Sequence, residues 1–495
     1  MSLAEHIHYI GPALALFVGA GLVLLVDLIQ GRKAATWGMT LTAITVGLGW
    51  TAAQALDGTA GEALSGSVVV DRFSIFVTFI ILVAALAVVA AAREWLSRLD
   101  GDAEFLALLL VSAGSMALLV QSNDLITLFV ALETTSIAQF IMAGIARNDK
   151  SAEAGLKYLL TGAVAAAVML YGFAFLFGIS GTVSLPGIAE FVRTAPESQR
   201  LPLILAFVFI AAGFGYKMAI APFHAWAPDV YEGSPAPVAS FLSVASKAAG
   251  FAIALRVFYT GLGGGDTFIA QDWAKLFGAL AVLSMLFGNT GAILQTNARR
   301  LLGYSSIAQA GNIAVGLAAV AAGSTMGPSG VLFFLGTYLA TNLGAFIAVT
   351  AVAERLGTER IEDYAGLVKR SPLTAGVLSI CLLSLTGIPP TAGFIAKVYI
   401  FNSAIQADQI WLLGVVAIAV LNTAIAAFYY LRWVRTMWLD EPKDGATFRP
   451  SGPTQAVLLA SVAGVLFFGM APTWLITAAQ RAAAPVSPPP HDYPL

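Results

Sequence analysis

The sequence has 495 residues, of which 58% are apolar and only 11% are charged, and this composition excludes a water-soluble surface. The net charge of −2 argues against nucleic-acid binding, which needs a basic face. A single cysteine, Cys381, excludes an internal disulfide, a cysteine-ligated zinc site and an iron–sulfur cluster, and four scattered histidines nominate no metal site. Redox cofactors are therefore expected in other chains.

Apolar stretches long enough to cross about 30 Å of hydrocarbon recur along the whole chain. Helices are the economical way for so many successive segments to satisfy their backbone groups in lipid. The sequence therefore predicts an all-α polytopic membrane protein with about 14 transmembrane helices. The predicted spans are 9–29, 36–55, 73–92, 104–121, 124–146, 154–178, 201–221, 236–260, 273–296, 300–322, 328–354, 372–403, 409–436 and 454–476.

Basic residues are distributed unevenly over the connections between these spans. Seventeen of the 26 Lys and Arg residues lie in odd-numbered connections. Such a bias places the odd-numbered connections in the cytoplasm and both termini outside it. In this topology 61–70 is an extracytoplasmic loop or short hairpin. Only five basic residues lie in even-numbered connections and the tail: Arg72, Arg193, Arg200, Lys275 and Arg481.

Four basic residues remain inside the predicted helices. Arg256 is near a helix end, where its side chain can reach the interface, and it is interpreted as an anchor. Lys217, Lys247 and Lys397 lie deeper, and each costs roughly 2.5–3.5 kcal/mol on insertion scales. Three such residues cost on the order of 8–10 kcal/mol, which packing alone does not explain.

One acidic residue matches these lysines in depth. Glu133 lies about ten residues into the span 124–146, and an intramembrane carboxylate normally pairs with a base. Because burial disfavours the charged forms of both carboxylates and amines, such groups are suited to passing protons. The alternative is a static ion pair that only fixes helix register. That alternative leaves two of the three lysines without an acidic partner.

Two of the lysines lie beside sequences that break helices. Lys217 precedes Ala221-Pro222, and Lys397 follows Gly387–Pro390 in an unusually long apolar segment. Broken helices in matching positions of two halves are typical of inverted-repeat transporters, whereas the alternative is an ordinary proline kink. The prediction is one transmembrane domain over 1–495. Its parts are peripheral helices over 1–103, inverted five-helix repeats over 104–260 and 273–436, broken seventh and twelfth spans, a last helix at 454–476 and a flexible tail at 477–495.

Polar side chains between the lysines could hold water or relay protons. The alternative is ordinary hydrogen bonding between helices, worth about 0.6 kcal/mol per pair. His224, at the first helix break, is interpreted either as a relay residue or as a residue that stabilises the connection. The polar residues are Tyr304, Ser305, Ser306, Gln309 and Asn312 in the span 300–322, and Tyr338, Thr341 and Asn342 in the span 328–354.

Three stretches, Lys217–Val238, Ala239–Phe251 and Arg299–Asn312, resemble the antiporter-like membrane subunits of respiratory complex I. The resemblance extends over essentially the whole chain. Within that family, Lys247 stands where the L-type subunit typically has histidine, and Lys397 stands where the M-type typically has glutamate. The tail is also too short for the lateral helix of the L-type. The residues therefore fit the N-type branch.

The resemblance implies roles that composition does not give. Glu133 would pair with Lys217 and sense a neighbouring subunit, Lys247 would relay protons along a central axis, and Lys397 would lie on the path at the second helix break. The chain itself would bind no cofactor or metal. NADH, FMN, iron–sulfur clusters and quinone would lie in partner membrane and peripheral subunits.

This reading implies a proton-translocating subunit in a bacterial cytoplasmic (inner) membrane, with both termini periplasmic, in contact with lipid, water and protons. Two alternatives remain. A subunit of a multi-subunit cation/proton antiporter would use the same lysines but would be driven by an ion gradient. A passive membrane scaffold would need the lysines only for assembly or stability.

Overall fold

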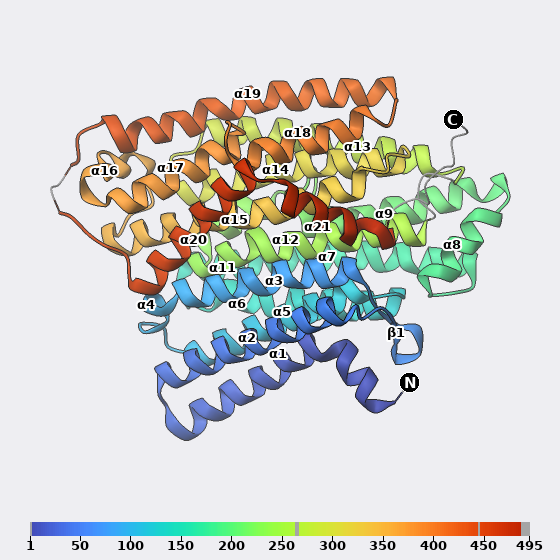
Figure 1. The fold of residues 1–495 in the computed structure, drawn as a ribbon, viewed down its shortest axis with the longest axis horizontal. Helices are drawn as coiled ribbons and strands as arrows, with labels where there is room; N and C mark the ends of the chain where they lie inside the picture. The colour runs from blue at the N-terminus through green and yellow to red at the C-terminus, as the bar shows by residue number, and fades with distance from the viewer. Residues whose placement is uncertain (1, 263–266, 444–445, 487–495) are drawn as a thin grey trace.

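The computed structural model describes residues 2–262, 267–443 and 446–486, and its helices form one bundle with a common long direction (Figure 1). Within these residues, eleven helices are long and apolar enough to cross a membrane. The predicted all-α polytopic class is confirmed. The count of fourteen stays a prediction, because the spans expected at 36–55, 300–322 and 372–403 overlap helices that are more polar or are interrupted.

The predicted hairpin at 61–70 is present as two short antiparallel strands that pair Gly61 with Val70. The elements of the first half are α1 (Leu3–Gln30), α2 (Lys33–Asp57), β1 (Gly61–Ala63), β2 (Val68–Val70), α3 (Arg72–Ala91), α4 (Arg93–Leu96), α5 (Asp102–Gln121), α6 (Leu125–Gly144), α7 (Asp149–Ser180), α8 (Leu185–Thr194), α9 (Arg200–Met218), α10 (Trp226–Gly233), α11 (Ala236–Phe241), the π-helical turn η3 (Leu242–Ser246), α12 (Lys247–Arg256) and a second π-helical turn, η4 (Val257–Gly261).

The second half is helical throughout its described residues. Its α-helices are α13 (Ala270–Ile293), α14 (Ala298–Ala321), α15 (Gly327–Leu356), α16 (Leu367–Arg370), α17 (Pro372–Thr386), α18 (Ala392–Ile405), α19 (Ile410–Leu439), α20 (Gly452–Met470) and α21 (Thr473–Ala483).

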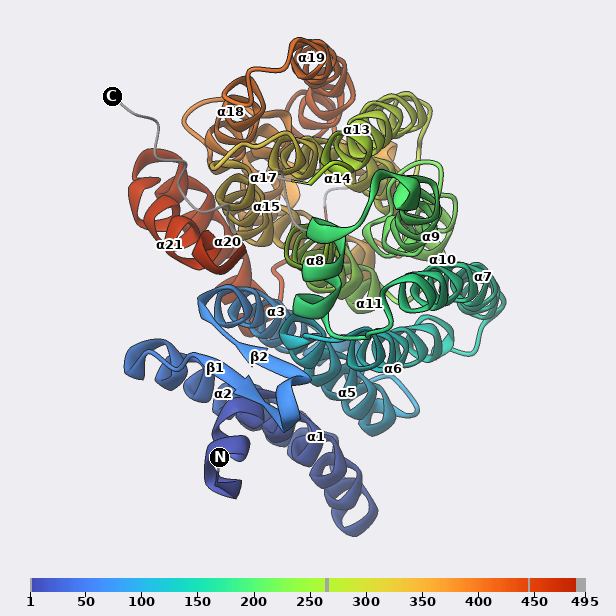
Figure 2. The ribbon, with the colours of Figure 1, turned by 90° about the vertical axis from the view of Figure 1, so that its right-hand side faces the viewer.

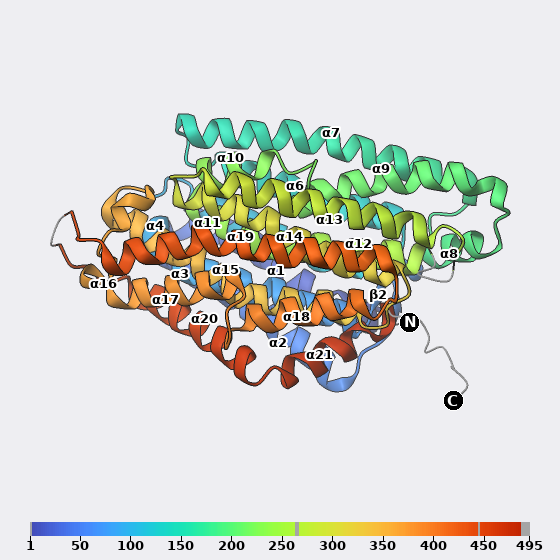
Figure 3. The same ribbon diagram turned by 90° about the horizontal axis from the view of Figure 1, so that it is seen from above.

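The end-on view shows how the helices are layered (Figure 2). Helices α1 and α2 lie at one edge and pack on α3 and α5, while α13, α18 and α19 lie at the opposite edge. Figure 3 shows α7 and α21 along two other, opposite edges. The segment from α11 to α12 lies in the middle, and every residue from 237 to 258 is buried. A charged residue on this segment is therefore far from lipid and from bulk water.

The first predicted helix break lies at the end of α9. Ala219 adopts a left-handed conformation with φ 57°, and the N–H of Ile220 donates to the carbonyl of Gly215 (2.9 Å). A cis Ala221-Pro222 bond follows, and the chain resumes as α10 at Trp226. Because proline has no backbone N–H, the helix cannot continue through this point.

The second break, between α17 and α18, repeats this geometry. Gly387 has φ 90°, and the N–H of Ile388 donates to the carbonyl of Leu383 (3.1 Å). Here too a cis X-Pro bond, Pro389-Pro390, begins two residues after the left-handed residue. Both predicted breaks are thus present with one hydrogen-bond pattern, which supports the two predicted repeats. The repeat organisation itself stays a prediction.

The C-terminal region differs from the prediction. A flexible tail was expected from 477, but α21 continues to Ala483 and a short 3₁₀ turn extends to Val486. The small side chains of Ala479, Ala482 and Ala483 are buried where α21 packs on α3 and α15, and this burial holds the segment in helical form. The remaining predicted tail, 487–495, lies outside the described residues.

Arg256 also differs from its interpretation as an interfacial anchor. Its guanidinium is buried, with the side chain 4% exposed, and one terminal nitrogen donates to both oxygens of Asp71 at 3.0 and 3.1 Å. The guanidinium also lies 4.9 Å from the centre of the Phe73 ring. Asp71 caps α3 by accepting from the N–H of Ser74 (2.7 Å), so this ion pair joins the end of α12 to the start of α3.

Breaking this buried pair should be costly, because it leaves one charge uncompensated inside the bundle. Asp71→Asn keeps a capping oxygen but removes the charge, and we expect a loss of about 3–5 kcal/mol in the free energy of unfolding. Denaturant unfolding of the purified protein in lipid nanodiscs measures this loss. The exposed pair Arg193–Glu190 provides the control, because Glu190→Gln should cost less than about 1 kcal/mol. Equal effects of the two substitutions would contradict the assignment.

Candidate functional site

The three predicted lysines are all buried inside the bundle, on α9, α12 and α18. Their exposed fractions are 3% for Lys217, 1% for Lys247 and 5% for Lys397. None has a carboxylate within ion-pair distance in the described part of the chain. The hydrogen bonds of their ammonium groups go to neutral oxygens. The lysines that do form ion pairs are others, namely Lys33, Lys157, Lys369 and Lys443.

Lys217 is held by the middle of α6. Its Nζ donates to Gln139 Oε1 at 2.9 Å and to Ser136 Oγ at 3.3 Å. The same Gln139 oxygen accepts from the hydroxyls of Tyr158 and Ser246, each at 3.1 Å. One amide oxygen therefore joins α6, α7, α9 and the π-helical turn that precedes Lys247.

Lys247 is the first residue after that π-helical turn, a feature that is frequent at functional sites. Its Nζ lies 2.5 Å from both the carbonyl and the hydroxyl oxygen of Ser306 on α14. The hydroxyl of Tyr338 on α15 donates to Ser306 Oγ at 3.3 Å. The Tyr338 ring centre also lies 6.0 Å from the ammonium group. Lys247 therefore bridges the first half of the chain to the second.

Lys397 uses the carbonyls that the second helix break leaves open. Its Nζ donates to the carbonyl oxygens of Leu385 (3.0 Å) and Thr386 (2.9 Å). Gln309 Nε2 on α14 donates to the same Leu385 oxygen at 2.8 Å. Ser306 and Gln309 are three residues apart on one helix, which places them on one face. Helix α14 thus connects the surroundings of Lys247 to those of Lys397.

We refer to Lys217, Lys247 and Lys397, with the polar groups that bond to them, as the row. Two buried asparagines beside this row lack protein partners for some of their polar atoms. Neither Nδ2 nor Oδ1 of Asn342 has a hydrogen-bond partner, and Asn312 Oδ1 has none, among the described residues. Buried amides are seldom left unsatisfied, and ordered water is the usual partner. The predicted polar residues around the lysines therefore line positions that suit water.

Glu133 is not in direct contact with a lysine. It is half-buried on α6, and it forms no ion pair or hydrogen bond with Lys217 in the described structure, although the two charges interact electrostatically through space. The expected direct ion pair is therefore wrong, because Gln139 and Ser136 occupy the hydrogen-bond positions around the ammonium group. A role for Glu133 in the function stays a prediction.

The other predicted residues divide into those in the row and those outside it. Ser305 hydrogen-bonds Tyr430 on α19, beside the row. Tyr304 is outside it, under Arg300, whose guanidinium lies 6.0 Å from the ring centre. His224 lies at the first break, stacks on Phe287 at 5.6 Å and contacts none of the lysines. The stacking of His224 on Phe287 favours a role in stabilising the connection between α9 and α10.

Sequence reasoning missed the residues that join the row. Gln139, Tyr158 and Ser246 are uncharged, so a search for buried charge does not single them out. A signal was nevertheless present, because Glu133, Ser136 and Gln139 recur every third residue along α6. Such a polar stripe marks a helix face that meets polar partners inside the bundle.

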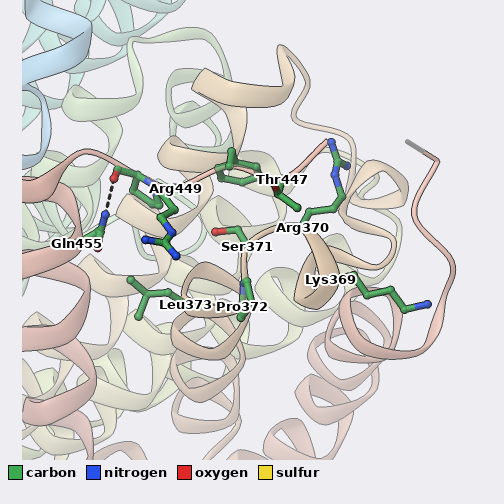
Figure 4. A pocket seen from close by; sticks show the side chains of 10 residues that line it. Lys369, Arg370, Ser371, Pro372, Leu373, Thr447, Arg449 and Gln455 are labelled. Carbon is green, nitrogen blue, oxygen red and sulfur yellow. Dashed lines mark hydrogen bonds between the residues drawn. The ribbon is translucent and has the colours of Figure 1, made fainter. Parts of the chain in front are cut away.

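A surface cavity of about 750 Å³ lies elsewhere, between the start of α17 and the segment 447–455. None of the three buried lysines lines it. Figure 4 shows that Lys369 is directed away from Arg449, and Lys369 pairs with Glu441 at 2.7 Å. Arg370 donates to the backbone carbonyl of Ala446 (3.3 Å). Lys369 and Arg370 thus serve local structure.

Residues 122–423 match the family described as "NADH:quinone oxidoreductase/Mrp antiporter, TM". NADH-quinone oxidoreductase subunit N of Heliobacterium modesticaldum is 41% identical over 421 residues, which are 84% of this chain and 85% of the relative.

Solved structures with the same fold include chains of several membrane complexes. A chain of respiratory complex I from Thermus thermophilus with bound aureothin is 31% identical and has a TM-score of 0.79, over 94% of this chain and 99% of that chain. A chain of the Mrp complex from Dietzia sp. has a TM-score of 0.83 over 98% of both chains, but at 22% identity this likeness shows the fold alone.

The shared oxygen of Gln139 gives a direct test of the row. Gln139→Leu removes the acceptor from three buried donors, and we expect a loss of about 2–4 kcal/mol in the free energy of unfolding. Gln139→Glu keeps an acceptor and should be tolerated better. Gln406→Leu, at an exposed position, should change stability by less than about 0.5 kcal/mol. Wild-type stability of Gln139→Leu in the same unfolding assay would show that the shared bond is unimportant.

Proposed function

The chain belongs to the NADH:quinone oxidoreductase/Mrp antiporter family of membrane proteins, and we propose that it is a proton-translocating membrane-arm subunit of an NADH–quinone oxidoreductase. One observation carries the proposal. In the described part of the chain, three buried lysines have no carboxylate within ion-pair distance, and each is held by neutral hydrogen-bonding groups on neighbouring parts of the bundle. Intramembrane ionisable residues arranged in this way are typical of proton paths.

The groups in the row have different chemical capacities. The amide oxygen of Gln139 and the carbonyl of Leu385 only accept hydrogen bonds, so they hold the ammonium groups of Lys217 and Lys397 in place. The hydroxyls of Ser246 and Ser306 both donate and accept, so together with water they can pass a proton. An unpaired charge inside the bundle is costly. A small change in nearby charge is therefore enough to move a proton onto or off one of these lysines.

Glu133 lies where a neighbouring subunit could change the charge near Lys217. It lies on a face of α6 whose apolar side chains are exposed in the isolated chain, including Val130 (58%) and Ile137 (53%). An exposed apolar face on a membrane helix suits contact with lipid or a neighbouring subunit. Since Glu133 interacts with Lys217 through space, a charge on that neighbour would shift the energy of a proton on Lys217.

The proposal also covers the surroundings of the chain. The redox cofactors, NADH, FMN, iron–sulfur clusters and quinone, belong to partner membrane and peripheral subunits, and quinone reduction there drives proton movement here. The protein is multi-pass in a bacterial cytoplasmic membrane, with both termini on the periplasmic side. The bias of basic residues toward the odd-numbered connections supports this orientation.

A subunit of a cation/proton antiporter is the alternative, because the Mrp complex shares the fold. The co-purifying proteins distinguish the two. We expect an affinity-tagged chain, extracted in a mild detergent, to bring flavin and iron–sulfur proteins with it, as seen by mass spectrometry and by the iron content of the sample. Recovery of small membrane subunits alone, without iron, would favour the antiporter.

Replacing a lysine of the row tests transport itself. In membranes with the assembled complex, Lys217→Ala or Lys247→Ala should lower NADH oxidation coupled to quinone, and the proton gradient it builds, by about tenfold or more. Electron transfer from NADH to a water-soluble acceptor should not change, because that chemistry lies in other subunits.

Lys275→Ala, at an exposed position on α13, provides the control and should pump normally. Assembly is followed by native gel electrophoresis in every variant. Full pumping in assembled Lys217→Ala and Lys247→Ala complexes would rule out the proposal. Loss of assembly alone, with normal pumping in the complexes that remain, would support the passive scaffold.

A further inference from the structure

A cleft of about 640 Å³ opens between α2, α3 and α21, at the end of the bundle that holds the start of α1 and the end of α21 (Figure 1). Its walls are mostly apolar. They include Ile75, Phe76 and Phe79 of α3 and Leu475 and Ala478 of α21. Phe79 is 48% exposed, so the cleft is open along the side of the bundle. Its shape and lining suit a hydrocarbon chain.

Two arginines line the same cleft. Arg72, at the start of α3, and Arg481, near the end of α21, have no ion-pair or hydrogen-bond partner among the described residues. Three other arginines at this end do have acidic partners, since Arg193 pairs with Glu190 at 3.3 Å, Arg200 with Asp272 at 3.0 Å and Arg256 with Asp71 at 3.0 Å. Basic residues are scarce on this side, and the two unpaired arginines lie at one cleft. The residues that line the cleft include two arginines and no acidic side chain.

The third wall of the cleft is α21, which continues α20 along the bundle to this end (Figure 1). Helix α21 runs along one edge of the bundle (Figure 3), buries its alanines on α3 and α15, and exposes Trp474 (75%). Arg72 is the first residue of a helix long and apolar enough to cross a membrane, and Arg481 lies near the end of α21 at the same end of the bundle. Arginines at the ends of membrane-crossing helices lie at the level of lipid headgroups. The two arginines thus sit at headgroup depth, with the apolar walls beside and below them.

We propose that this cleft binds one acidic phospholipid. Its phosphate lies between Arg72 and Arg481, because guanidinium groups bind phosphate through paired, charge-assisted hydrogen bonds. One acyl chain lies along Phe76, Phe79 and Leu475. The binding would fasten α21 to α2 and α3. The proposal does not depend on proton translocation and stands on the cleft alone.

Photo-crosslinking in the assembled complex tests the site. Complexes in nanodiscs are given phosphatidylglycerol or phosphatidylcholine that carries a diazirine on the same acyl chain, and labelled peptides are mapped by mass spectrometry. We expect labelling of α3 and α21 to favour phosphatidylglycerol roughly 10- to 30-fold, as two basic groups at the interface imply. Arg72→Gln/Arg481→Gln should reduce this preference to near unity, and Arg72→Lys/Arg481→Lys should retain much of it.

Lys275→Gln provides the matched control, because it removes an exposed basic residue from the same end of the bundle without touching the cleft. It should leave the lipid preference unchanged. Ala478→Trp fills the cleft without changing charge and should lower labelling by both lipids. Equal labelling by the two lipids in the wild type overturns the proposal. Labelling by neither lipid also overturns it and indicates that a segment of a partner subunit occupies the cleft.

Discussion

The structure depends on one constraint. An ammonium group buried in a membrane bundle needs oxygen atoms that accept its hydrogen bonds. No carboxylate lies within ion-pair distance of Lys217, Lys247 or Lys397 in the described structure, so neutral oxygens meet this need. In a regular helix the backbone carbonyls are already used by the helix itself, which leaves side-chain amides, hydroxyls and the ends of helices. The two helix breaks, the π-helical turn before Lys247 and the polar face of α14 each supply such oxygens. These irregular features of the fold all adjoin the lysines.

The two breaks share a backbone geometry but serve their lysines differently. Lys217 lies two residues before the left-handed Ala219, in the last turn of α9, and reaches across to Gln139 on α6. Lys397 lies ten residues after Gly387, in the second turn of α18, and its side chain turns back to the carbonyls at its own break. The first lysine therefore bonds to a neighbouring helix, whereas the second closes the gap between the two halves of its own helix.

The sequence predicts the features that carry a large energetic cost and misses those that carry a small one. A lysine or a Pro-Pro pair in an apolar segment is conspicuous, so the three lysines and both breaks follow from the sequence alone. Gln139 and Ser246 cost little in a membrane helix, and their importance comes from helices that meet only in the fold. Arg256 was misread because depth along a helix does not tell which neighbour it faces, and Asp71 lies 185 residues away. The direct contact expected for Glu133 failed for a related reason, since a neutral amide took its place.

Hydrogen bonds between protein atoms divide the row into three segments. The first runs from Lys217 through Gln139 to Ser246, and the second runs from Lys247 to Ser306 and Tyr338. The third joins Gln309, the carbonyl of Leu385 and Lys397. The second and third segments approach each other on α14, where Ser306 and Gln309 are one turn apart. Asn342 follows Tyr338 by one turn of α15 and is next to Thr341, whose hydroxyl bonds Ser384. Because the Asn342 amide has no protein partner among the described residues, it can hold water beside Tyr338 and Thr341. The proposed proton path along the row therefore needs water between the segments as well as the three lysines.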